Sequence, residues 1–263
     1  MRKAKGSGDA ADYYDFYRPG YPRACISQIE VSARLSPDSR LVEVGAGSGK
    51  ASGQFLERGY RLLCIEPGRR LAELGQKKHR DKPVTYAISR FEDWDGPAGQ
   101  YDLVFSAQAF HWVPQPEGYK RSARVLKPEG ALALFWNLYT EQSDSPVPEY
   151  MEVCRKNGLI PFQDEYEIER RILHERDGIA NSGYFGQPEV YRYPWSQAYD
   201  TESFLGLIRT GNGFLGLSEA DQTRLSQELA GILNRNGGRI VLHYLCVLFI
   251  ASKKASSGIE SVK

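Results

Sequence analysis

Three alternating glycines mark the stretch of this chain where chemistry is most readily placed. Gly45, Gly47 and Gly49 follow the short apolar run 41–44, and a helical pattern begins after them. Glycine at such a turn allows positive φ and lets a ligand approach the bare backbone. Glu43 lies two residues before the first glycine. The pattern predicts a ligand cradle between a buried strand and a helix, although a glycine-rich surface turn without a ligand is the plain alternative.

The type of ligand depends on spacing and charge. A dinucleotide fingerprint, G-x-G-x-x-G, needs its third glycine where this chain has Lys50, one residue after Gly49. The carboxylate of Glu43 disfavours a pyrophosphate and suits a ligand that carries a cationic group. Glu66 ends a second apolar segment, 61–67, at the separation where an acid hydrogen-bonds ribose hydroxyls. We therefore expect a nucleoside with a positive group rather than NAD.

A second group of candidate residues follows the apolar segment 101–107. Gln108, His111 and Trp112 emerge at its end, where open α/β sheets place their ligands. His111 is either a general base or substrate contact, or a residue that packs beside Trp112. Trp112 is better suited to a pocket wall than to catalysis. Phe91 either stacks on a purine or belongs to the core.

The segment 11–22 is dense in aromatic residues and contains Arg18. It is either a helix packed on the core or a lid whose arginine and tyrosine hydroxyls reach a ligand. Residues alone do not separate these alternatives.

Composition limits the class of protein. The chain has 263 residues, of which 25% are charged and 41% hydrophobic, with a net charge of +1. This length supports a sizeable core, and the balanced charge argues against a dedicated nucleic-acid binder. There is no apolar run of transmembrane length and no signal-peptide pattern, so we expect a cytoplasmic protein without a membrane partner. The four cysteines are scattered without a C-x-x-C pair and are expected to be reduced core residues rather than metal ligands.

Strands alternate with helices through the first half of the chain, which predicts a doubly wound, parallel α/β sheet. We expect five parts. They are a disordered N-terminus at 1–10, a cofactor-binding core with N-terminal lid helices at 11–137, a helical cap insertion at 138–186, strands and helices completing the sheet at 187–253, and a flexible tail at 254–263.

Several of these motifs together resemble a known family. VEVGAGSGK, the acid of CIEP, FEDW, YDLVFSAQAFHW and RVLKPEGALALFWN occur in the order found in class I S-adenosylmethionine-dependent methyltransferases. YYDFYRPGYP and the Phe-His-Trp triplet narrow the resemblance to trans-aconitate methyltransferases and related small-molecule enzymes. The resemblance covers 12–137 well and the C-terminal strands loosely. It implies a Rossmann-like sheet of seven strands whose last strand is antiparallel, with S-adenosylmethionine as cofactor.

The resemblance also implies residue roles. The methionine end of the cofactor would be held at the first motif, the ribose at the second and the adenine at FEDW, with Gln108 beside the sulfonium and the N-terminal segment closing over the site. The expected cofactor-binding residues are Tyr13, Arg18, Tyr21, Glu43, Gly45, Gly47, Gly49, Glu66, Pro67, Phe91, Glu92 and Gln108; the expected substrate-pocket residues are His111, Trp112 and Tyr139. Two departures stand out: Glu43 replaces the family's usual Asp, and Arg90 stands where many relatives carry an acid.

The leading hypothesis is methyl transfer to a small organic acceptor, at a carboxylate or hydroxyl oxygen. A carboxylate acceptor needs no base, whereas a hydroxyl does. The alternatives are methylation of a macromolecule such as tRNA or protein, a non-catalytic cofactor-binding protein and, last, an NAD dehydrogenase.

Overall fold

The computed structural model describes residues 15–141 and 148–255. Within those ranges the chain divides into two compact units. Of the described residues, unit 1 comprises 15–20, 137–141, 148–170 and 193–246, and unit 2 comprises 21–136, 171–192 and 247–255. Tyr13 and the segment 1–10 lie outside the described residues, and so does most of the expected tail 254–263. The five-part division of the sequence stays a prediction.

The strands form one seven-stranded mixed sheet in the order β3-β2-β1-β4-β5-β7-β6, with the last strand antiparallel, as expected. The pairs β1–β2, β1–β4, β2–β3 and β4–β5 are parallel. The strands are β1 Arg40–Val44, β2 Arg61–Ile65, β3 Val84–Ala87, β4 Tyr101–Ala107, β5 Leu126–Tyr139, β6 Glu189–Asp200 and β7 Arg239–Ser252. The Rossmann-like fold class predicted from the sequence is therefore confirmed.

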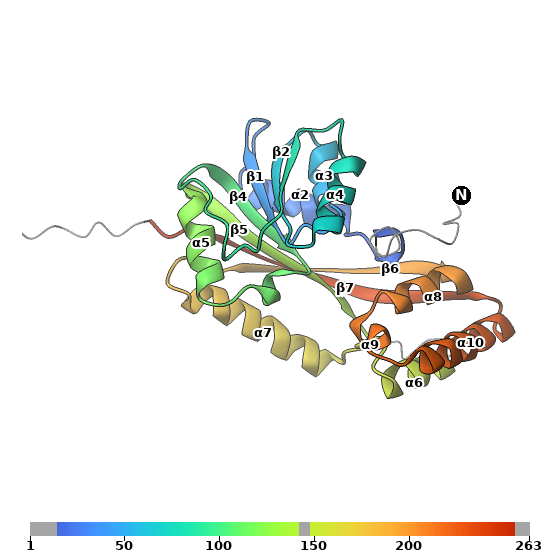
Figure 1. The fold of residues 1–263 in the computed structure, drawn as a ribbon. Helices are drawn as coiled ribbons and strands as arrows, with labels where there is room; N and C mark the ends of the chain where they lie inside the picture. Colours follow the sequence, from blue (N-terminus) through green and yellow to red (C-terminus); the bar gives the residue numbers. More distant parts are fainter. Residues whose placement is uncertain (1–14, 142–147, 256–263) are drawn as a thin grey trace, which may run out of the picture. The chain divides into compact units, whose positions relative to one another are not determined.

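Unit 2 holds the parallel strands as far as Trp136 of β5, together with the helix that precedes β1 and the helices between the strands (Figure 1). These helices are α2 Arg23–Ser32, α3 Ser52–Glu57, α4 Arg69–Lys78, the 3-10 turn η1 Phe110–Trp112, and α5 Glu117–Val125. Helix α7, Glu165–Asn181, runs through the unit boundary, and its residues from Arg171 onward belong to unit 2. β1 has the burial expected of a central parallel strand, because its last four residues are all buried.

The parallel register decides which residues meet at the carboxyl edge of unit 2. Val44 pairs with Ile65, so the residues that follow these two strands are neighbours. Gly45 N–H donates to the Ile65 carbonyl at 2.8 Å, which fixes the start of the glycine turn on β2. The Ser106 hydroxyl donates to the Val44 carbonyl at 2.7 Å and joins β4 to the same edge. The order of strands changes direction between β1 and β4, the place where such sheets bind ligands.

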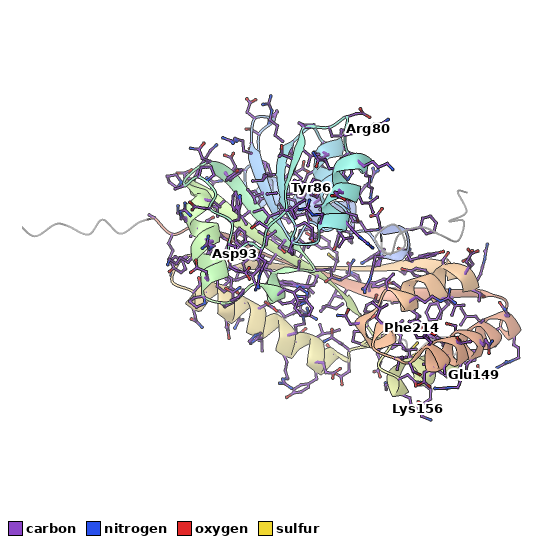
Figure 2. The ribbon with its side chains drawn as sticks, viewed as in Figure 1. Arg80, Tyr86, Asp93, Glu149, Lys156 and Phe214 are labelled. Carbon is purple, nitrogen blue, oxygen red and sulfur yellow. The ribbon has the colours of Figure 1, made fainter. Side chains whose placement is uncertain are left out.

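Unit 1 has a core of its own, built from helices on the distal parts of the long strands. Its helices are α6 Pro148–Lys156, α8 Thr201–Arg209, α9 Asn212–Leu215 and α10 Glu219–Arg235. Side chains from α6, α8 and α10 pack with Tyr199 and Tyr244 in one buried cluster. Figure 2 labels Phe214 of α9 in this region, where it is buried, and Glu149 and Lys156 of α6, which are exposed.

Some element boundaries differ from expectation. β5 begins at Leu126 rather than at 131, because the LKPEG segment pairs with β4 across a register shift between Tyr101 and Leu103. The short helix α9 was not expected, since four residues carry no periodic signal. All four cysteines are buried and free of disulfides. No helix in the described ranges is long and apolar enough to cross a membrane.

Candidate functional site

The glycine turn has the backbone geometry that its sequence predicts. Gly45, Gly47 and Gly49 have φ of 68°, 56° and 78°. A side chain on Gly45 would collide with Ala109, and one on Gly49 would collide with the Tyr86 hydroxyl. Nothing lies within 4 Å of the place where a Cβ on Gly47 would stand. The middle of the turn therefore faces open space, and the glycines on either side of it allow close packing.

Glu66 holds the turn from the end of β2. One carboxylate oxygen accepts the N–H of Gly47 at 2.9 Å, and the other accepts the N–H of Gly68 at 2.8 Å. The residue is only 7% exposed. A pyrophosphate at this turn would be repelled by the Glu66 carboxylate, and it could not accept a hydrogen bond from the Gly47 N–H, which already donates to Glu66. A ligand with hydroxyl donors fits better, because each carboxylate oxygen still has acceptor capacity.

Glu43 lies beneath the turn rather than beside its opening. It is 1% exposed and its carboxyl accepts a hydrogen bond from the Ser52 hydroxyl. Ser52 Oγ also lies 3.1 Å from Cys64 Sγ. Burial raises the pKa of Glu43 to about 8, against the opposing hydrogen bonds from Ser52. Near neutral pH the carboxyl therefore holds its proton, and the anionic charge at the turn comes from Glu66.

The other predicted cofactor contacts in unit 2 occupy different environments. Phe91 is buried and stacks on Trp94 with centroids 6.1 Å apart. Glu92 accepts a 2.6 Å hydrogen bond from Arg90, so the arginine that departs from the family pattern pairs with this carboxylate. Gln108 has φ of 63° and donates its backbone N–H to the Phe135 carbonyl.

The remaining predicted contacts near the turn are Tyr21 and Pro67. The ring of Tyr21 packs edge-on against Phe135 at 4.9 Å, and its carbonyl accepts from Gln54 Nε2. Pro67 precedes Gly68, the residue that caps the start of α4. The described residues of unit 2 thus bring most of the predicted cofactor set to one edge of the sheet. Their contacts with a cofactor stay a prediction.

Arg18 and Tyr139 belong to unit 1. The Arg18 guanidinium donates to the Thr210 carbonyl at 2.9 Å, a contact between residues 192 positions apart. Tyr139 packs against Tyr244 at 5.1 Å and Phe162 at 6.4 Å. Both residues thus have structural partners in their own unit.

His111 and Trp112 lie in η1, directly after the loop that packs on Gly45. Trp112 is 70% exposed, so its side chain is not enclosed. His111 Nδ1 accepts a hydrogen bond from Trp136 Nε1 at 3.3 Å. Partial burial and the neighbouring Arg171 lower the pKa of His111. Sequence reasoning missed the Trp136 contact, because Trp136 has the pattern of an ordinary strand residue.

Among the described residues, no group of three or more His, Cys, Asp or Glu side chains is placed to hold a metal ion.

The fold and the glycine turn agree with comparisons to known proteins. A family model described as a methyltransferase domain matches residues 42–134. An uncharacterised methyltransferase of Mycobacterium tuberculosis is 32% identical over 152 residues, which cover 57% of this chain and 59% of the relative. A probable S-adenosylmethionine-dependent methyltransferase of Saccharomyces cerevisiae is 26% identical over 178 residues, covering 65% of this chain and 58% of the relative.

A solved structure of a putative type II methyltransferase from Anaeromyxobacter dehalogenans shares the fold, with a TM-score of 0.63, 22% identity, and coverage of 91% of this chain and 98% of that one. The chain thus has a Rossmann-like α/β fold. Residues 42–134 thus match a methyltransferase domain, and the relatives support a class I S-adenosylmethionine-dependent methyltransferase with S-adenosylmethionine as its cofactor. The match spans 59% of the length of the first mycobacterial relatives.

The residues of the turn fit this cofactor. The Gly47 position is open, and Glu66 offers acceptor oxygens for ribose hydroxyls. The narrower resemblance to trans-aconitate methyltransferases stays a prediction.

Proposed function

We propose that this protein transfers a methyl group from S-adenosylmethionine to a small organic acceptor, at an oxygen atom. One observation carries the proposal beyond the family: a cavity of about 400 Å³ in unit 2, lined in part by Phe110 and His111. Their neighbour Ala109 packs on Gly45 of the cofactor turn. A cavity of this volume suits a small molecule rather than a macromolecular surface.

The chemistry divides between the cofactor and the chain. When bound, S-adenosylmethionine supplies a methyl group already activated on a sulfonium. Glu66 and the turn would hold the nucleoside, and Gln108 would lie beside the sulfur. A site lined by apolar and aromatic side chains would favour a reaction that disperses charge once water is displaced from it. Holding both reactants in line can contribute several kcal/mol to lowering the barrier.

Cofactor binding is the first test. Calorimetry should show S-adenosylmethionine binding to the native chain and at least roughly tenfold weaker binding to Glu66→Ala, because a hydrogen bond to a charged group is worth about 1.5–3 kcal/mol. Glu73→Ala is the matched control, since Glu73 is an exposed α4 carboxylate paired with Arg69. Circular dichroism would establish that Glu66→Ala remains folded, because Glu66 also holds two backbone N–H groups.

Turnover is the second test. Release of S-adenosylhomocysteine is measured with a panel of small alcohols, phenols and carboxylic acids, and with tRNA and protein extracts. Product from small molecules supports the proposal. Product only from RNA, with a steep salt dependence, would replace it with macromolecular methylation. Cofactor binding without any product would favour a non-catalytic protein.

A further inference from the structure

The cavity beside His111 has polar groups on two facing elements. His111 lies on η1, and Glu175 lies on α7. Its apolar walls include Phe110, Val113, Pro116 and Tyr119. Its other polar side chains are Gln115, His174, Asn181 and Ser182. All residues that line the cavity belong to unit 2, so the cavity lies within a single unit. A mostly apolar cavity with a few convergent polar groups is the usual form of a small-molecule site.

The first polar group, His111, is held in one tautomer. Trp136 Nε1 can only donate, so the hydrogen bond at 3.3 Å requires a lone pair on His111 Nδ1. The lowered pKa of His111 keeps the ring neutral at pH 7. A neutral imidazole whose Nδ1 is unprotonated carries its single ring proton on Nε2. The remaining ring nitrogen therefore donates a hydrogen bond, and His111 is unsuited to removing a proton from an acceptor.

The second polar group, Glu175, is suited to that task. Burial raises its carboxyl pKa, against the opposing effects of Arg171 and His174. Glu175 in turn contributes to raising the pKa of Tyr119 to about 12, after burial. A carboxylate whose pKa is shifted toward neutrality is a better general base than a solvated one. The surroundings lower the pKa of His111 and raise the pKa of Glu175. Opposite shifts of this kind are typical of two groups that take different roles in acid–base catalysis.

The charged and titratable groups around the cavity come from three elements. Arg171, His174 and Glu175 lie on α7, Tyr119 on α5 and His111 on η1. The Arg171 guanidinium also lies over the Trp136 ring, 5.8 Å from its centroid. Arg171 thus faces both the tryptophan that orients His111 and the carboxylate of Glu175.

We propose that this cavity binds the hydroxyl group of an apolar acceptor, an alcohol or phenol, with His111 donating a hydrogen bond to its oxygen and Glu175 accepting its proton. This inference rests on the proposed function and specifies its substrate class. A hydroxyl both accepts and donates, so it complements the two groups. A carboxylate acceptor would have no proton to transfer to Glu175.

The transfer balances with these roles. The hydroxyl proton passes to the Glu175 carboxylate, the oxygen forms a bond to the methyl carbon, and the carbon–sulfur bond breaks with its electrons left on sulfur. The products are a methyl ether, S-adenosylhomocysteine and a proton, which Glu175 returns to solvent. Trp136 acts as a positioning residue, because its indole N–H donates to His111 and it does not line the cavity.

A binding experiment tests the inference without turnover. The chain has four histidines, so long-range ¹H–¹⁵N spectra can assign their tautomers with His111→Gln as the reference. We expect His111 of the native chain in the Nε2–H form. The variant Trp136→Phe keeps an aromatic ring at this position but lacks the N–H donor, so we expect His111 to populate a mixture of tautomers there. A native His111 in the Nδ1–H form would overturn the inference.

Phenol, anisole and benzoate are the ligands for the second arm. Phenol should shift the His111 signals at concentrations at least roughly tenfold below those needed for anisole or benzoate. Glu175→Gln should remove this preference, whereas Asp177→Asn should keep it. Asp177 is the matched control, since it is an exposed carboxylate of the same helix paired with Arg176. Equal binding of phenol and benzoate, or unchanged phenol binding in Glu175→Gln, would overturn the assignment.

Turnover separates this inference from the proposed function. Product from hydroxyl acceptors that falls about 10²–10⁴-fold in Glu175→Gln supports it, with the loss greatest at the pH where the native carboxylate is ionised. Product from carboxylic acids alone would sink the inference and leave the proposed function standing. No product from any acceptor would remove both.

Discussion

At the scale of single residues, burial changed the meaning of a carboxylate that the sequence singles out. Glu43 and Glu66 were expected to flank the glycine turn with two negative charges. The structure gives them different environments: Glu66 accepts two backbone N–H groups at the turn, whereas Glu43 is buried against Ser52. Charge selection for a cationic nucleoside thus depends on Glu66, and Glu43 supports the turn from below.

The raised pKa of Glu43 makes a prediction about stability. Its folded pKa of about 8 exceeds the reference value of 4.5, so the folded chain binds this proton more tightly than the unfolded chain. The associated stability is fully present below pH 4.5 and is lost as pH rises through 8. Glu43→Gln cannot ionise. Relative to the native chain, it should gain on the order of a few kcal/mol between pH 5 and pH 9.

Urea unfolding of the cofactor-free chain at pH 5, 7 and 9 would measure this difference. Glu73→Gln is the control, because an exposed carboxylate should give the native pH dependence. Parallel curves for Glu43→Gln and the native chain would show that Glu43 is not buried as described.

At the scale of elements, the turn between β1 and α3 is packed from two directions. Tyr86 of β3 lies against Gly49 and Gly75, and His79 Nε2 lies 3.1 Å from the Gly49 carbonyl. Figure 2 labels Tyr86 in the region of the parallel strands. The turn therefore depends on β3 and α4 as well as on its own glycines.

Two alanine substitutions in this turn should differ in cost. Gly47→Ala meets only the strain of its positive φ, about 1–2 kcal/mol, because the space around it is open. Gly49→Ala has the same strain, and its Cβ would also lie 2.5 Å from the Tyr86 hydroxyl. Chemical denaturation should therefore rank Gly49→Ala as the less stable variant. Adding Tyr86→Phe to Gly49→Ala should recover part of the loss, and no recovery would mean that the contact with the Tyr86 hydroxyl is not its main cause, since the Cβ would also lie 2.9 Å from His79.

At the scale of the whole molecule, the predicted cofactor contacts divide unequally between the two units. Glu66, the three glycines and Gln108 belong to unit 2, whereas Arg18 belongs to unit 1 and bonds to Thr210 there. Arg18 thus has a structural contact within unit 1, and its role as a lid residue stays a prediction.

Hydrogen exchange with S-adenosylmethionine tests this division. At a hundredfold excess over Kd the cofactor should stabilise the chain by about 2.7 kcal/mol. Exchange should slow at 43–49 and 64–68 of unit 2, while α10 of unit 1 serves as the internal control. If Arg18 closes over the cofactor, Arg18→Ala will weaken binding. Native affinity in that variant would assign Arg18 to the packing of unit 1 alone.

Local patterns in the sequence determined the parallel strands and the glycine turn of this protein. The alternating glycines, the apolar strands and the acid at the end of β2 each follow from steric and hydrophobic rules that act over a few residues, and β7 was expected with the bounds that the structure has. Tertiary structure alone decided which polar side chains meet. Trp136 reaches His111 from β5, and α7 brings Glu175 to the same cavity. Such pairings join residues 25 or more positions apart, because packing rather than local periodicity selects them.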